Sequence, residues 1–166
     1  AVPIPHFAVP GARISIMCIR VGERIKDRTV RKMIDRWIAE ATECDFKVAL
    51  EVKKPKSWLK SVSAFANGIG GTLFFGIDDD RNVVGLSDAQ IDAETISRLI
   101  KERITPYPSF VLAPERENGK DILVLSVSSG RSTPYYYKAD GIMEAYIRIG
   151  NESVIAPSYA LNQLIL

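Results

Sequence analysis

Three carboxylates in the middle of the chain could hold a metal ion. Glu51 lies in the alternating stretch DFKVALEVK, and Asp78 and Asp79 directly follow the apolar stretch TLFFGI. Mg²⁺ and Mn²⁺ take oxygen ligands, and a metal that bridges phosphate oxygens is a common route to phosphodiester cleavage. A simpler interpretation pairs Glu51 with a neighbouring lysine and assigns the aspartates to a turn. The residue types favour this simpler interpretation but allow a metal site, with Glu51 and Asp78 as catalytic ligands.

A lysine cluster follows Glu51 directly and consists of Lys53, Lys54, Lys56 and Lys60. The whole chain has a net charge of +2, but residues 1–60 hold 13 Lys and Arg against 7 Asp and Glu, a net of +6. A basic segment of this kind suits a polyanion such as nucleic acid, and a solvated surface is the alternative. We predict that these four lysines contact phosphates.

Aromatic and basic side chains gather again near the end of the chain, at Tyr135, Tyr136, Tyr137, Tyr146 and Arg148. Rings beside guanidinium groups suit single-stranded bases or a sugar–phosphate chain. Strand alternation places Tyr146 and Arg148 on one face, and core packing is an equally good role for any one tyrosine. We predict Tyr146 and Arg148 as further nucleic-acid contacts.

Several other chemistries are disfavoured. The single histidine, His6, lies in a proline-rich stretch, which does not suit a nucleophile triad or a histidine zinc site. Cys18 and Cys44 form no CxxC pair, so we expect reduced thiols in a cytoplasmic protein. The glycine turn at 68–71 follows a helix and enters a strand, the reverse of a phosphate-binding loop, so ATP binding is not expected. No apolar run is long enough for a membrane helix.

The first half of the chain is expected to contain the elements that position the lysines. Residues 1–12 are uncharged and proline-rich, which indicates an arm or leader, and residues 13–42 predict a short strand and an amphipathic helix. Residues 45–53 alternate as a half-buried strand that displays Glu51. A helix then begins near Pro55 and ends at Asn67-Gly68 in a left-handed turn.

The second half predicts a buried strand at 72–77 and a helix opened by a Ser87–Gln90 capping box, with Ile91 on its core face. Two hairpins turn at Asn118-Gly119 and Asp140-Gly141, and residues 157–166 form a closing helix. Intermixed helices and antiparallel hairpins indicate a two-layer α+β domain over residues 43–166.

The spacing of five short motifs resembles the Schlafen-type AlbA-like domain, whose signature runs E-F-K, A-F-A-N-x-x-G-G, G-V-D-D and V-x-G. The matching segments are LEVK at 50–53, VSAFAN at 62–67, GGTL at 70–73, GIDD at 76–79 and VGL at 84–86. The resemblance implies an Alba-related fold with a mixed sheet, found in candidate transcriptional regulators and in helicase-related or AAA-type ATP-binding proteins.

The resemblance also implies what the domain does. Some animal members of the family cleave RNA with three acidic residues, of which Glu51 and Asp78 match two, whereas the third position falls on Phe46. We therefore expect a domain that binds DNA or RNA and needs no cofactor. The alternatives are an RNA endonuclease that uses Mg²⁺ or Mn²⁺, an ATP-binding regulatory protein and a protein-interaction module. A homodimer is favoured over a monomer.

Overall fold

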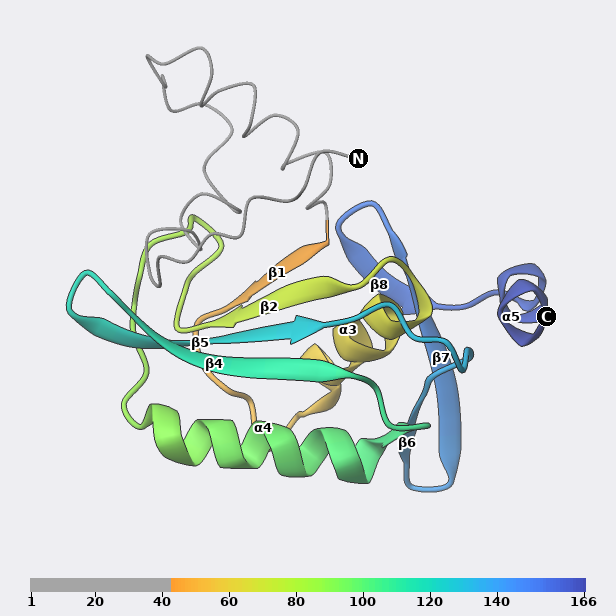
Figure 1. The fold of residues 1–166 in the computed structure, drawn as a ribbon, viewed down its shortest axis with the longest axis horizontal. Helices are drawn as coiled ribbons and strands as arrows, with labels where there is room; N and C mark the ends of the chain where they lie inside the picture. The colour runs from red at the N-terminus through yellow and green to blue at the C-terminus, as the bar shows by residue number, and fades with distance from the viewer. Residues whose placement is uncertain (1–42) are drawn as a thin grey trace, which may run out of the picture.

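The computed structural model describes residues 43–166, so the elements predicted within residues 1–12 and 13–42 lie outside the described part (Figure 1). In chain order the described elements are β1 (Cys44–Lys47), α3 (Lys56–Asn67), β2 (Gly71–Phe75), α4 (Ala89–Arg103), β3 (Ile104–Thr105), β4 (Phe110–Glu117), β5 (Lys120–Val127), β6 (Tyr136–Ala139), β7 (Ile142–Ile149), β8 (Glu152–Ile155) and α5 (Ser158–Ile165). Helices and strands are intermixed, which confirms the α+β class.

The first sheet is mixed and has the order β1-β2-β5-β4, in which β1 and β2 are parallel and the other pairs antiparallel. Its strand β2 is buried on both faces, as its unbroken apolar sequence predicts. Leu73 and Phe75 pack into the main core together with residues of α3 and α4, whereas Phe74 packs with Phe46 on the opposite face. Both helices therefore cover the same face of this sheet.

The second sheet is antiparallel, with the order β3-β6-β7-β8. The turns of both predicted hairpins are confirmed, because Asp140 and Gly141 both have positive φ between β6 and β7, as Asn118 and Gly119 do between β4 and β5. The pairing of β8 with β7 was not predicted. Tyr137 and Tyr146 contribute to the main core beside α3, so this helix packs against both sheets (Figure 1).

Helix α3 is buried over most of its length. Trp58, Leu59, Val62 and Phe65 are fully buried, and the small residues between them let the two sheets approach closely. The helix ends at Asn67 as predicted, but the expected left-handed residue is displaced. Gly68 has a φ of −116°. Gly70 has a φ of +86°, and a Cβ there would lie 2.8 Å from the Val127 carbonyl oxygen.

The strand predicted at 45–53 is much shorter in the structure, because β1 ends at Lys47. Its partner β2 ends at Phe75, and Gly76 turns away with a φ of +97°. A strand that continued past Lys47 would have no neighbour to receive its backbone hydrogen bonds. The alternation of residues 48–53 therefore does not produce a strand, and Val48 and Val52 are about half exposed.

Helix α4 is capped by Asp88 rather than by the predicted Ser87. The Asp88 carboxylate accepts a hydrogen bond of 3.0 Å from the Ile91 backbone N–H. Ile96, Leu99 and Ile100 are buried as predicted, but Ile91 is exposed. At about 100° per residue, Ile91 and Ile100 point to opposite sides of the helix, so the prediction of one shared face was wrong.

Candidate functional site

A groove of about 710 Å³ lies at the N-terminal end of α3, and all four predicted lysines line it. Arg103, at the end of α4, and the aromatic residues Tyr137 and Tyr146 also contribute. Its full lining is Lys53, Lys54, Pro55, Lys56, Ser57, Lys60, Arg103, Tyr137, Ala139, Asp140, Tyr146, Ser153, Val154 and Ile155. The fold thus joins the lysine cluster to the second sheet.

The turn that carries the lysines is held by the start of α3. The Ser57 N–H donates to the Lys54 carbonyl at 3.1 Å, and the N–H groups of Trp58 and Leu59 donate to the Pro55 carbonyl at 3.2 and 2.9 Å. Lys56 and Lys60 are one helical turn apart and so lie on one side of α3. Because these three N–H groups are already bonded, they are not available to an anion, which would meet the lysine side chains of the groove.

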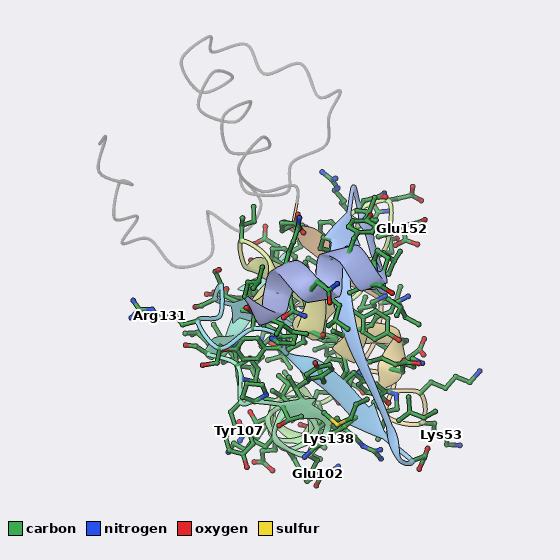
Figure 2. All side chains as sticks on the ribbon, turned by 90° about the vertical axis from the view of Figure 1, so that its right-hand side faces the viewer. Lys53, Glu102, Tyr107, Arg131, Lys138 and Glu152 are labelled. Carbon is green, nitrogen blue, oxygen red and sulfur yellow. The ribbon has the colours of Figure 1, made fainter. Side chains whose placement is uncertain are left out.

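Most cations of this groove have no counter-charge. Within residues 43–166, Lys53, Lys54, Lys60 and Arg103 have no ion-pair partner. Figure 2 shows Lys53 extending outward from the edge of the domain. Asp140 is the single acidic residue that lines the groove in the described part of the chain. Unpaired cations around one hollow create a positive field that attracts polyanions.

Lys56 is the exception among the four lysines. Its Nζ lies 2.8 Å from Oε2 of Glu144, and the hydroxyl of Tyr146 donates to the same oxygen at 2.7 Å. The hydrogen bond to Glu144 raises the pKa of Lys56, and the bonds from Lys56 and Tyr146 lower the pKa of Glu144. Burial, followed by the hydrogen bond to Glu144, raises the pKa of Tyr146, so its hydroxyl keeps the proton that it donates.

Arg148, which was predicted to contact nucleic acid, does not line the groove. Its side chain is 6% exposed, and its Nε donates to Oε2 of Glu43 at 3.0 Å. The Nη groups donate to Ser153 Oγ at 3.1 Å and to the Cys44 carbonyl at 3.3 Å. Tyr146 and Arg148 do share a strand face, but that face packs inward against α3. There the guanidinium carbon of Arg148 lies 5.1 Å from the centre of the Phe65 ring. Arg148 therefore joins β7 to β1.

The carboxylates predicted as metal ligands have different surroundings. Glu51 lies in an irregular, exposed segment before α3, not on a strand. Asp78 accepts hydrogen bonds of 2.7 and 3.1 Å from the backbone and side-chain amides of Asn82, which fits the turn interpretation. Across residues 43–166, no three or more His, Cys, Asp or Glu side chains form a group that could hold a metal, so Glu51, Asp78 and Asp79 are not gathered into one. The use of Mg²⁺ or Mn²⁺ stays a prediction.

The glycine turn at 68–71 has packing reasons for its composition. A Cβ on Gly71 would lie 2.5 Å from the ring of Phe65, and Gly70 lies against the backbone of β5 and the segment that follows it. Ser129 also donates a hydrogen bond of 2.6 Å to the Gly68 carbonyl. Close packing of α3 on the sheet therefore accounts for these glycines. The expectation about ATP stays untested by this geometry.

Among the residues that line the groove, sequence reasoning did not assign Arg103 or Tyr137 to the site. Arg103 is the last residue of α4, and it reaches the groove because the chain continues into β3, which pairs with β6. Tyr137 was considered as part of the aromatic group but not assigned to the site. Neither position has a local sequence signal, since both depend on how β6 pairs.

No helix in the described part of the chain is long and apolar enough to cross a membrane.

Comparisons with known proteins agree with this architecture. The N-terminal domain of a RecG-related protein from Nitrosomonas europaea, named as a candidate ATP-dependent DNA helicase, is 27% identical. Its TM-score is 0.51, and the match covers 73% of this chain and 88% of that one. The DIP2311 protein from Corynebacterium diphtheriae is 21% identical with a TM-score of 0.51, over 69% of this chain and 25% of that one, and supports the fold alone.

The family comparison covers the same region as the described domain. The family model for Schlafen, AlbA_2 matches residues 40–157, which span every strand of both sheets as well as α3 and α4. This match includes the motifs AFAN, GG and GIDD from which the resemblance was first inferred. The chain therefore belongs to the Schlafen AlbA_2 family.

Proposed function

We propose that residues 43–166 bind nucleic acid, DNA or RNA, in the groove at the N-terminal end of α3. The observation that carries this proposal is that Lys53, Lys54, Lys60 and Arg103 line one groove without ion-pair partners in the described chain. Membership of the Schlafen AlbA_2 family and the similarity to a domain of a RecG-related protein support it.

The groove chemistry suits the phosphate backbone better than the bases. Tyr137 and Tyr146 line the groove, but they are 6% and 4% exposed, so their faces are not open for base stacking. Lysine ammonium groups bind phosphates as point charges and carry no sequence information. We therefore infer binding with little sequence preference, in which the four unpaired cations provide the attraction.

The salt dependence of binding follows from this assignment. Each phosphate neutralised by a cation contributes a log–log salt slope of about −0.9 on duplex DNA and about −0.7 on a single strand. Four cations therefore predict a slope of about −3 to −4 on duplex DNA. Fluorescence anisotropy with end-labelled single- and double-stranded DNA and RNA, titrated across salt, measures this slope for each probe.

The decisive variant reverses two unpaired charges, as Lys53→Glu/Lys54→Glu. We expect it to weaken binding about 30-fold or more at about 50 mM salt, because two phosphate contacts become repulsive. Its matched control is Lys101→Glu/Arg131→Glu, which makes the same change in net charge at exposed positions outside the groove. Unchanged affinity in the groove variant, or an equal loss in the control, would overturn the assignment.

The same samples test the nuclease alternative when Mn²⁺ or EDTA is added and the probes are run on a gel. Metal-dependent shortening that is lost in Glu51→Gln and Asp78→Asn would support catalysis at these residues. Equal cleavage by both variants would indicate a contaminant.

ATP binding, a homodimer and a cytoplasmic location also stay predictions. Light scattering of the purified protein measures the oligomeric state.

A further inference from the structure

Lys56 differs from the other groove lysines in having a carboxylate in contact with its ammonium group. The side chain of Lys56 is 49% exposed, so a phosphate can reach it, whereas that of Glu144 is 20% exposed. The Lys56 Nζ also lies 5.8 Å from the centre of the Tyr137 ring. A phosphate that approaches this lysine therefore meets the negative charge of Glu144, which already contacts the ammonium group.

The position of Glu144 is set by the sheet and not by Lys56. Glu144 lies within β7, where it pairs with Tyr137 of β6, and the Tyr146 hydroxyl on the same strand face donates to its Oε2. If Lys56 turned to another anion, the carboxylate would keep this phenolic donor. Losing Lys56 therefore does not leave the Glu144 carboxylate without a hydrogen bond, which keeps the cost of the exchange low.

We propose that Glu144 is a built-in counter-ion of the groove, which occupies Lys56 and competes with a nucleic-acid phosphate for it. This inference rests on the proposed function and adds a residue that limits its affinity. Glu144 weakens binding in two ways: it engages one of the groove cations, and it repels phosphate oxygens that approach. Nucleic-acid phosphates therefore bind to the unpaired cations of the groove in preference to Lys56.

Glu144→Gln tests the competition, because glutamine keeps the shape and can still accept the Tyr146 hydroxyl. We expect binding of labelled single- and double-stranded DNA and RNA to tighten about 3- to 10-fold at about 50 mM salt. The salt slope should steepen by about 0.7 to 0.9, since one more phosphate contact forms. The control is Glu152→Gln, which removes one negative charge from β8 at an exposed position distant from Lys53 (Figure 2).

A double-mutant cycle with Lys56→Gln identifies the group that Glu144 competes for. We expect Lys56→Gln to change affinity less than about 2-fold in the wild-type protein, where the lysine is already paired, and about 3- to 10-fold in the Glu144→Gln protein. An effect of equal size in both backgrounds would overturn the proposal. So would an affinity gain no larger than that of Glu152→Gln, or weaker binding by Glu144→Gln, which would make Glu144 a positioning residue for Lys56.

Inorganic polyphosphate, a polyanion without bases, separates failure of this inference from failure of the proposed function. If the wild-type protein binds none of the four nucleic-acid probes but Glu144→Gln gains affinity for polyphosphate over Glu152→Gln, the competition stands and nucleic-acid binding falls. If nucleic acid binds and Glu144→Gln gains nothing, the inference alone falls. No binding of either kind of probe by any of the proteins overturns both.

Discussion

The two ends of α3 both carry polar side chains, but their hydrogen bonding differs. At the C-terminal end, Asn67 Oδ1 accepts from the Tyr135 N–H at 2.7 Å, and its Nδ2 donates to the carbonyls of Tyr135 and Tyr146 at 3.0 and 2.9 Å. Ser63 adds two hydrogen bonds to the backbone of the same two residues, Tyr135 and Tyr146. At the N-terminal end, Lys53, Lys54 and Lys60 have no ion-pair partner within the described residues.

The difference separates polar groups that stabilise the fold from those available to a ligand. A buried polar group has to be hydrogen-bonded internally, since water cannot reach it, so its capacity is already used. Arg148 and Lys54 illustrate this for two cations. The side chain of Arg148 is 6% exposed, with its donors directed at Glu43, Ser153 and the Cys44 carbonyl, whereas Lys54 is exposed and lines the groove. Only the second kind of cation attracts a phosphate.

The largest expected effect on stability comes from Arg148→Met, which keeps much of the side-chain length but removes every donor. Glu43, whose side chain is 16% exposed, would lose its ion-pair partner, and Ser153 and the Cys44 carbonyl would lose hydrogen bonds. We expect the free energy of unfolding to fall by about 3 kcal/mol. Urea denaturation measures this loss, with the exposed Arg131→Met as control. If Arg148→Met had normal stability but bound nucleic acid more weakly, Arg148 would be a nucleic-acid contact and not a residue that stabilises the fold.

The next effect is that of Asn67→Ala, which removes three hydrogen bonds from α3 to the backbone of Tyr135, just before β6, and of Tyr146 in β7. We expect a loss of about 2 kcal/mol, because backbone groups of Tyr135 and Tyr146 are left without their partner. Thermal unfolding followed by circular dichroism measures it. Asn162→Ala, at an exposed position of α5, should change the melting temperature little. Equal melting temperatures for the two variants would remove the distinction between the ends of α3.

The groove lysines should show the opposite pattern, with an effect on binding and little on stability. Because Lys53 and Lys54 are exposed and have no ion-pair partner within residues 43–166, Lys53→Glu/Lys54→Glu should change the free energy of unfolding by less than about 0.5 kcal/mol. Urea denaturation of the variant used for binding checks this. A large loss of stability would mean that its weaker binding reports on folding instead of the interface.

The smallest expected effect is the pH dependence of stability that comes from the ion pair of Lys56, at the N-terminal end of α3, with Glu144. The pKa of Glu144 is below its ordinary 4.5, so its contribution is present above that pH and is lost as pH falls through the lower, folded pKa. The pKa of Lys56 is above its ordinary 10.5, so its contribution is lost only as pH rises beyond that value. When the pH is lowered to about 3.5, the free energy of unfolding should therefore fall slightly less for Glu144→Gln than for the wild type, as measured by urea denaturation. A larger loss in the variant would contradict this sign.

Local patterns predicted much of the fold. The hairpin turns at Asn118-Gly119 and Asp140-Gly141 and the burial of β2 were all correct, because turn geometry and unbroken apolar runs depend on neighbouring residues. The strand predicted at 45–53 was wrong beyond Lys47, since strand length depends on how far the partner strand extends. In the same way, Ile91 belonged to the apolar pattern but lies on the exposed side of α4.

The candidate site was predicted in part. The four lysines and Tyr146 do line one groove, because the lysines are close in sequence and one helix start holds them. Arg148, predicted as a nucleic-acid contact, lies outside this groove in an ion pair with Glu43, and Arg103 was not considered. Alternation shows which side chains share a strand face, but not whether that face points to solvent or to a helix.

The sequence by itself determined the family, the α+β class and the place of the basic cluster, because motifs, periodicity and charge runs are local properties of the chain. The tertiary structure decided which of the charges are available. Lys56 is paired by Glu144, and Arg148 by Glu43, across long stretches of sequence, whereas Lys53, Lys54 and Lys60 have no such partner in the described residues. Ion pairing depends on distance in space and on burial, and both are set only when the sheets pack around α3.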